Sequence, residues 1–370
     1  MTYKKGDKIG KYTVTRDFDS ANGGQGQWGF AEYNGEEYFI KKFLSPVYPE
    51  VKTPGSEKGK QKKKDKCQEF ARKHLAMMKA LKSCGDGGLV VKTTDFFKYG
   101  NEFGSHYFKI SQKVNTSNLC NEVYNLDWKE RLFIMLTSVG ALKILHKNSI
   151  IHLDLKPDNI LIQEWEGKLI AKIIDFDSSI IEGDSTPSEE LVGDPLYLSP
   201  EFAKHINTHG EESPPTKKSD VFSLGLVFCQ YWTGKLPGFS DKYRYPYEAL
   251  LNGKKLKLPM KLPMKLPRFF SNKTKEEELA EKAVFELIEK MLILEPHLRI
   301  STDEVHENLK AIRSGKLPKT SLPAEKKILP KVSRIKTNLK TTNSEKPKEK
   351  EDYPKHSKHS KVRINFTKKS

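Results

Sequence analysis

The sequence has few cysteines and no long hydrophobic run, and each scarcity excludes a class of protein. Its four cysteines, Cys67, Cys84, Cys120 and Cys229, form no CxxC pair, so neither a zinc site nor a disulfide framework is indicated. We therefore expect reduced thiols in a cytoplasmic, reducing compartment. The N-terminus is polar, without an apolar signal core, and the longest apolar run, at 221–232, is too short and interrupted to span a bilayer. That run is typical of a buried helix.

Hydrophobic residues are also scarce, at 36% of the 370 residues, which indicates that part of the chain lies outside any core. Acidic residues are too few to balance the basic ones, and the net charge is +17. The excess is concentrated in two segments, because residues 314–370 carry a net +12 and residues 51–66 a net +5. The rest of the chain is therefore close to neutral.

Residues with catalytic potential are concentrated in the stretch IIHLDLKPDNIL at 150–161. Asp154 follows an apolar strand, with Lys156 two residues on and Asn159 five residues on, and a second carboxylate, Asp175, ends the next apolar strand. A carboxylate can accept a hydroxyl proton, a lysine can neutralise a moving phosphoryl group, and an amide with a carboxylate can hold Mg²⁺. The alternative is a hairpin in which Asp and Asn only form turns.

This stretch resembles the eukaryotic-type protein kinases, in their Ser/Thr-directed branch. The string HLD…N at 152–159 is similar to their catalytic loop, and DFD at 175–177 is similar to their metal-binding DFG turn. The resemblance implies an α+β, bilobal protein-kinase-like fold, with a small, mainly β N-lobe that has one major helix and a larger, mainly α C-lobe. The expected divisions are a flexible lead-in (1–11), the N-lobe (12–110) with a basic flexible insertion (45–66), a hinge (111–114), the C-lobe (115–313) and a disordered Lys-rich tail (314–370).

Three glycines, Gly24, Gly26 and Gly29, fit the spacing GxGxxG between two predicted strands. Glycine lets backbone N–H groups approach phosphate oxygens without a Cβ in the way, although a glycine-rich hairpin gives the same letters. By the resemblance, these glycines and Ala31 cover a bound nucleotide. Ile110 would guard the back of the adenine pocket, and Ser111 would begin the hinge.

An Asn-Gly turn at 34–35 precedes the strand that carries the candidate phosphate-anchoring lysine. Matching this strand to the family pattern selects Lys41. A tight two-residue turn would instead pair Tyr38 with Ala31, and period-two alternation would then put Lys42 on the Ala31 face. We prefer Lys41, with Lys42 as the rival; the third alternative is that both are solvated strand lysines.

The helix predicted at 67–82 is where the family carries a glutamate that pairs with the strand lysine. Its apolar stripe places His74 at that position. Glu69 lies five residues earlier and fits an i,i+4 pair with Lys73. Either His74 replaces the glutamate, or the helix is shifted and Glu69 serves.

The C-lobe sequence contains further landmarks of the family and three departures from it. Asp220 is expected to brace the catalytic loop, and Arg299 to pair with Glu201. Leu153 stands where many members have an arginine that binds a phosphate on the activation loop, so we expect activity independent of such phosphorylation. The other departures are Asp177, in place of a flexible glycine, and Asp194, which could repel the base or pair with Lys156.

The resemblance implies an ATP-dependent protein serine/threonine kinase that uses Mg²⁺, with Mn²⁺ as the alternative metal, and a protein as substrate. Two other interpretations stay open: an impaired kinase-like scaffold that acts through its basic tail, and a small-molecule phosphotransferase. The tail at 314–370 could hold nucleic acid nonspecifically, an anionic membrane or an acidic protein. It could equally be a solvated segment or a target of the chain's own phosphorylation.

Overall fold

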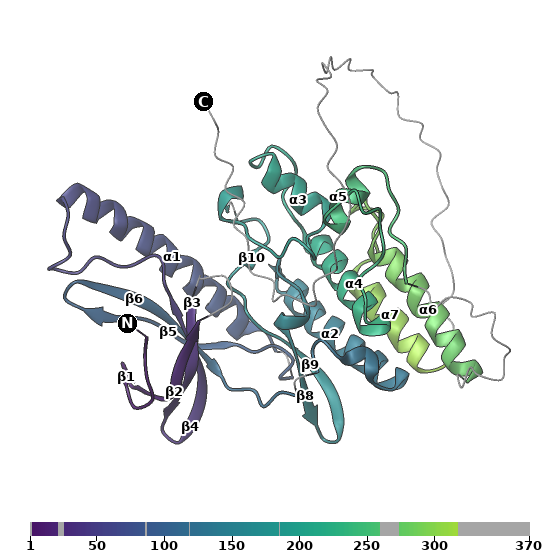
Figure 1. Cartoon of the computed structure of the whole chain (residues 1–370), viewed down its shortest axis with the longest axis horizontal. Helices are drawn as coiled ribbons and strands as arrows, with labels where there is room; N and C mark the ends of the chain where they lie inside the picture. The colour runs from purple at the N-terminus through teal and green to yellow at the C-terminus, as the bar shows by residue number, and fades with distance from the viewer. Residues whose placement is uncertain are drawn as a thin grey trace, which may run out of the picture.

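The computed structural model describes residues 2–20, 26–85, 87–117, 119–184, 186–259 and 274–316. A strand-rich N-terminal part is followed by a helical C-terminal part, as the predicted α+β, bilobal fold requires (Figure 1). Gly24 lies outside the described residues. So does the tail predicted at 314–370, apart from its first three residues.

The N-terminal part is one antiparallel sheet and one long helix. The sheet has the strand order β1-β2-β3-β4-β6-β5. Its hairpin at 34–35 closes with Asn34 at φ 54° and Gly35 at φ 80°, which confirms the predicted two-residue turn. The elements are β1 (Lys8–Ile9), β2 (Tyr12–Ser20), β3 (Gly26–Tyr33), β4 (Glu36–Phe43), α1 (Glu57–Ser83), β5 (Thr93–Asn101) and β6 (Gly104–Gln112).

The C-terminal part is built around two buried helices, α2 and α4. Asp127 and Glu130 form a capping box at the start of α2, and 13 of the 17 residues of α4 are buried, as predicted for its apolar run. The elements are α2 (Trp128–Lys147), β7 (Ile150–Ile151), β8 (Ile160–Trp165), β9 (Lys168–Ile173), β10 (Ile180–Ile181), α3 (Pro200–Asn207), α4 (Lys217–Thr233), α5 (Pro246–Leu251), α6 (Lys275–Met291) and α7 (Thr302–Arg313), with 3₁₀ turns at Val123–Asn125, Pro157–Asn159 and Ser188–Glu190.

Residues 8–9 of the segment 1–11, which was predicted to be a flexible lead-in, belong to the sheet. Strand β1 pairs with β2, and the Ile9 side chain is fully buried. The Tyr3 carbonyl also accepts a hydrogen bond from the Phe18 N–H at 2.9 Å. One buried isoleucine and a short strand pairing are enough to order a segment whose composition is polar.

Helix α1 begins at Glu57, ten residues before the predicted start, so part of the predicted flexible insertion at 45–66 is helical. Ser56 caps the helix by accepting the N–H of Gly59 at 3.2 Å, and lysine and glutamine are good helix formers. This end of α1 projects away from the C-terminal part (Figure 1). Its first ten residues contain no buried hydrophobic residue, and the first one in the helix is Cys67, so apolar periodicity could not reveal them.

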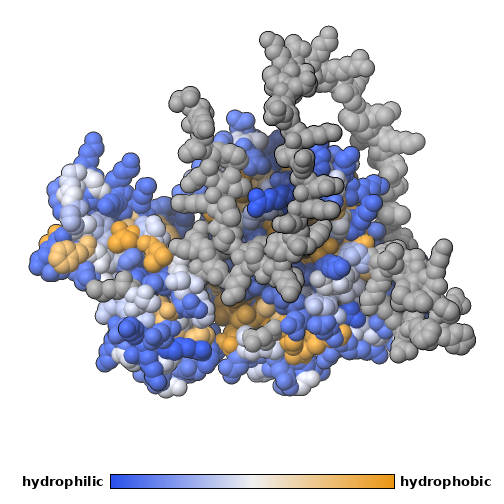
Figure 2. Space-filling model, viewed as in Figure 1, coloured by the Kyte–Doolittle hydropathy of each residue, from blue (hydrophilic) through white to orange (hydrophobic). Residues whose placement is uncertain are grey.

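Exposed hydrophobic side chains are scattered over the described residues. Figure 2 shows a mostly hydrophilic face with small, separate hydrophobic patches. The most exposed large side chains are Val51 and Phe103, on two loops joined by the hydrogen bond from the Lys52 N–H to the Glu102 carbonyl, and Trp165, at the end of β8. Scattered residues of this kind indicate no docking surface by themselves. Among the described helices, none is both long enough and apolar enough to cross a membrane.

An ion pair joins the start of α3 to the segment before α7, as the sequence predicted. Arg299, whose side chain is fully buried, donates to both carboxylate oxygens of Glu201 at 2.7 and 3.0 Å. Its remaining N–H groups donate to the backbone carbonyls of Lys218, Ile293 and Leu294. Burial alone would raise the pKa of Glu201, but the guanidinium outweighs it and the pKa is lowered. The pair is therefore charged at neutral pH.

Replacing Glu201 with Gln should lower the free energy of unfolding by about 3 kcal/mol at pH 7, because it leaves a buried guanidinium without its counter-charge. Urea denaturation followed by circular dichroism measures this. The matched control is Glu307→Gln, which breaks an exposed pair with Lys310 and should change the free energy by less than about 1 kcal/mol.

The same variant has a pH signature. A carboxyl with a lowered pKa adds stability above its unfolded pKa and loses it as the pH falls. The difference between the wild-type chain and Glu201→Gln should thus shrink as the pH drops below about 4. A difference that stays constant into acid would show that charge is not its cause.

Candidate active site

The backbone of the loop after β7 is held by one buried carboxylate. Asp220, at the start of α4, accepts the N–H of His152 at 2.8 Å and that of Leu153 at 2.9 Å. The His146 ring, on α2, lies 2.9 Å from the same carboxylate. Leu153 has φ 62°, a conformation that costs free energy for a side-chain-bearing residue and needs such support. The predicted bracing role of Asp220 is confirmed.

His152 serves as a packing residue, as predicted. Its Nε2 is 3.0 Å from the carbonyl oxygen of Ile174, and its ring packs edge-on against Phe176 at 5.2 Å. Phe176 is 7% exposed and belongs to the core of the C-terminal part. The histidine therefore ties the catalytic loop to the segment that carries Asp175.

Asp154, Lys156 and Asn159, predicted to act together, lie together in the structure. Asn159 donates its Nδ2 to an Asp154 carboxylate oxygen at 3.0 Å and to the Asp154 carbonyl at 2.6 Å. The backbone N–H of Asp194 donates to the other Asp154 oxygen at 3.0 Å. Lys156 pairs with the Asp194 carboxylate at 3.1 Å. Of the two roles foreseen for Asp194, the structure thus shows the pair with Lys156.

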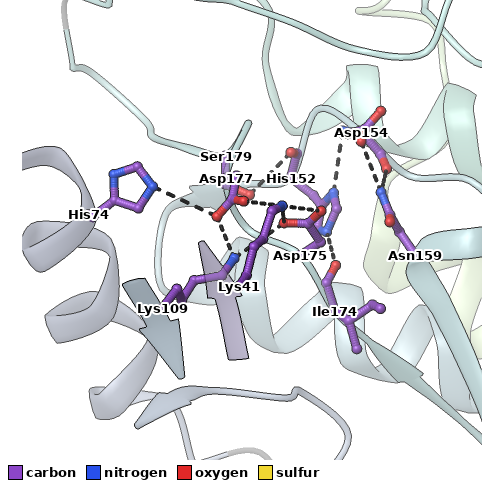
Figure 3. A network of polar contacts seen from close by, with 10 residues as sticks. All are labelled: Lys41, His74, Lys109, His152, Asp154, Asn159, Ile174, Asp175, Asp177 and Ser179. Carbon is purple, nitrogen blue, oxygen red and sulfur yellow. Dashed lines mark hydrogen bonds and ion pairs between the residues drawn. The ribbon is translucent and has the colours of Figure 1, made fainter. Parts of the chain in front are cut away.

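Of the two candidate lysines on β4, Lys41 is the one whose side chain points toward Asp175 and Asp177 (Figure 3). Its Nζ lies 3.2 Å from the Asp175 carboxylate and also contacts Asp177. Burial alone would lower the pKa of Lys41, but the carboxylates of Asp177 and Asp175 outweigh it and raise the pKa. Lys42 points to the other face of the sheet, where its Nζ is 3.3 Å from Gln27, and burial lowers its pKa.

The register of the sheet corrects the predicted contacts of Ala31 and Ile110 with a nucleotide. Directly opposite residues in an antiparallel pair share a face. Lys41 is opposite Trp28 and Lys109, whereas Ile110 is opposite Ile40 and Ala31 is opposite Tyr38. The side chains of Ala31, Ile40 and Ile110 are fully buried in one core cluster, on the face away from Lys41. The tight turn places them there, as period-two alternation requires.

Other predicted residues of the N-terminal part are closer to Lys41. Ser111 is opposite Phe39, two residues before Lys41, and so shares its face. A Cβ on Gly26 would lie 3.6 Å from the Lys41 side chain, which shows that this glycine borders the lysine. A Cβ on Gly29 would lie 2.5 Å from the Phe18 ring, so close packing within the sheet explains this glycine.

Sequence reasoning missed an aromatic cluster on the Lys41 face. Trp28 stacks on Phe39 with centroids 5.8 Å apart, and Phe30 packs edge-on against both at 6.0 Å. All three side chains are only half-buried. Alternation from Lys41 through the turn at 34–35 could have identified them.

A second missed residue is Lys109, whose Nζ contacts Asp177 and lies 3.3 Å from Asp175. On α1, His74 points toward the same group, with its Nε2 3.8 Å from Asp177. Glu69 is exposed and pairs with Arg72 at 2.8 Å and Lys73 at 3.8 Å. Of the two candidates on α1, His74 is therefore the one near Asp177, which contacts Lys41. Glu69 pairs with other residues and does not take the place of the family's glutamate.

Comparisons with known proteins match this chain to protein kinases. The protein-family model described as "Protein kinase domain" matches residues 55–309, a range that begins after Lys41. A 166-residue stretch is 37% identical to the ovarian-specific serine/threonine-protein kinase Lok of Drosophila melanogaster, covering 45% of this chain and 31% of Lok. A 210-residue stretch is 28% identical to a probable serine/threonine-protein kinase of Dictyostelium discoideum, covering 56% of this chain and 22% of that protein.

A bacterial relative shows the same pattern over a shorter stretch. The serine/threonine-protein kinase PrkC of Bacillus subtilis is 37% identical over 111 residues, which cover 30% of this chain and 16% of PrkC. The chain thus spans less than a third of the length of these relatives. The family match itself extends over more than half of the chain and includes the catalytic loop, Asp175, Glu201 and Arg299. The chain belongs to the protein kinase domain family.

Proposed function

We propose that this chain transfers the γ-phosphate of ATP to serine or threonine hydroxyls of proteins. The observation that carries the proposal is the meeting of groups from three separate segments. Lys41 comes from β4, Asp175 follows β9, and Asp154 and Asn159 come from the catalytic loop. A backbone hydrogen bond of 3.0 Å from Ile174 to Asn159 joins the last two segments.

Asp154 is the group that orients the substrate hydroxyl and accepts its proton. One of its oxygens is held by the Asn159 side chain and the other by the backbone N–H of Asp194, so its direction is fixed before a substrate arrives. Fixed direction matters because general-base catalysis needs the carboxylate within hydrogen-bond reach of the proton. Lys156, now paired with Asp194, is placed to neutralise the moving phosphoryl group.

The residues present fit a bound Mg²⁺. Asn159 uses its side-chain N–H to hold Asp154, which leaves the amide oxygen as its ligating atom, and Asp175 supplies a carboxylate. Oxygen donors of this kind suit Mg²⁺ or Mn²⁺. Asn159 and Asp175 would hold the ion, which would supply positive charge to neutralise the phosphates. Lys41 would draw the α- and β-phosphates into line, beneath the hairpin that contains Gly26.

Replacing Asp154 with Asn should lower the rate of phosphate transfer by at least about 100-fold, because the base is lost while its shape is kept. The affinity for ATP should change little, since the partners to which Figure 3 joins Asp154, His152 and Asn159, belong to the C-terminal part. Transfer from radiolabelled ATP to a generic basic protein and to the chain itself, followed by phosphoamino acid analysis, measures this.

Asp303→Asn is the matched control, because Asp303 pairs with Lys143 on the surface, and it should keep full activity. Full activity in Asp154→Asn would contradict the assignment. Labelled phosphotyrosine, or transfer to a small molecule only, would contradict the Ser/Thr protein specificity. A wild-type chain that binds ATP without transferring phosphate would favour the impaired scaffold.

Activity should not depend on phosphorylation of the segment between Asp175 and Glu201. Leu153 packs with Leu191, Leu198 and Phe202 in an apolar cluster, where it cannot bind a phosphate. Two glutamates of the segment already hold it: Glu182 pairs with Lys217 at 2.7 Å, and Glu190 pairs with Lys73 on α1. Carboxylates in these places supply the negative charge that a phosphate would bring.

Treatment with a phosphatase, and separately the substitution Thr186→Ala, should therefore change the rate of transfer by less than about twofold, as no phosphate-binding contact is lost. Mass spectrometry verifies the phosphorylation state before each assay. If phosphatase treatment silences the enzyme and Thr186 is the only site that loses phosphate, this prediction is wrong.

A further inference from the structure

Two lysines and two carboxylates form a compact group where the sheet meets the turn after β9 (Figure 3). Lys41 on β4 lies directly opposite Lys109 on β6, so both side chains leave the same face of the sheet. Asp175 and Asp177 are two residues apart, and each contacts both lysines. The four side chains are at most 22% exposed.

The charges of this group balance only as a set of four. Lys41 alone would face two carboxylates, leaving one buried negative charge without compensation, which is costly. Lys109 supplies the second positive charge, and its side chain is only 9% exposed. Burial alone would raise the pKa of Asp177, but the ammonium groups of Lys109 and Lys41 outweigh it and hold the pKa well below its ordinary value.

Helix α1 contributes no carboxylate to this group. The residue that it brings nearest is His74, whose ring stacks on Phe96 with centroids 5.0 Å apart and packs against Phe43 and Phe70. Its Nε2 is buried, has no hydrogen-bond partner among the described residues and lies 3.8 Å from Asp177. His74 is thus the residue of α1 that faces this group, and the carboxylate that contacts both lysines beside Asp175 is Asp177.

We propose that Asp177 and Lys109 are positioning residues, with Asp177 holding Lys41 in line for the nucleotide phosphates and Lys109 balancing the charge of Asp177. The inference rests on the proposed roles of Lys41 and Asp175. If Asp175 held a metal ion, Asp177 would be the remaining carboxylate in contact with Lys41 among the described residues. Without Lys109, Asp177 would compete with the phosphates for Lys41.

The test is a double-mutant cycle between the two positions. Lys109→Met and Asp177→Asn should each lower kcat/KM by about tenfold or more, whereas the double variant should lose much less than the product of the two, because it restores charge balance around Lys41. Steady-state kinetics with varied ATP, and the affinity for a fluorescent ATP analogue with Mg²⁺, give the two readouts. Lys109→Arg, which keeps the charge, should retain most of the activity.

A rescue experiment separates positioning from a structural role. Adding His74→Glu to Asp177→Asn returns the lost negative charge from the helix side and should recover kcat/KM by about tenfold. Its control is His74→Gln in the same background, which should recover nothing. Lys98→Met, which breaks a pair with Glu50 elsewhere in the sheet, should leave activity unchanged.

The proposal would be overturned if the losses of the two single variants multiply in the double variant and His74→Glu recovers no activity. So would single variants that keep normal kinetics and affinity. If the wild-type chain transfers no phosphate, the proposed function fails, and the same cycle measured by nucleotide affinity still decides on the positioning pair. Thermal unfolding of every variant identifies any that fails to fold, and Lys109→Arg then carries the comparison.

Discussion

The contact between Lys41 and Asp175 is the interaction on which the site depends, because it joins a strand of the N-terminal part to the turn after β9. The two side chains are only 18% and 22% exposed, so an unmatched charge beside them would be costly. Asp177 therefore requires Lys109, and the result is a neutral group of four at the junction of the two parts. The cost of an unmatched buried charge fixes where Lys41 points.

The site residues of the C-terminal part could be predicted from sequence because their geometry follows from short spacings and from unusual buried charges. Asp154 and Asn159 are five residues apart on one loop, so covalent geometry alone brings them close. Asp220 and Arg299 are charged residues in apolar surroundings, and such residues need specific partners. The bilobal fold was implied by the resemblance to the protein kinases, which these landmarks carried.

The N-terminal part was harder to predict because side-chain direction in a sheet depends on register. A shift of one residue exchanges the two faces of the sheet. The resemblance put Ala31 and Lys41 on the same face, whereas the turn at 34–35 put them on opposite faces. The register agrees with the turn, and Lys41, which the resemblance selected, is the lysine of β4 that contacts Asp175. Lys109 had no signal of its own, since a lysine in a strand is usually solvated, and the first turns of α1 lack the apolar residues that periodicity detects.

Because Asp175 and Asp177 contact Lys41, helix α1 does not have to supply a glutamate to this lysine. A lysine anchored by a helix glutamate is released whenever that helix moves, so such a helix is a natural point of control. Here the described contacts of the Lys41 ammonium group with carboxylates come from Asp175 and Asp177, and α1 contributes only the ring of His74, at the far side of Asp177. A displacement of α1 would thus remove the stacking around His74 and the Lys73–Glu190 pair while leaving both Lys41 contacts in place. Movement of the segment that carries Asp175 and Asp177 would break both contacts at once, which makes that segment, rather than the helix, the element that determines whether Lys41 is in position.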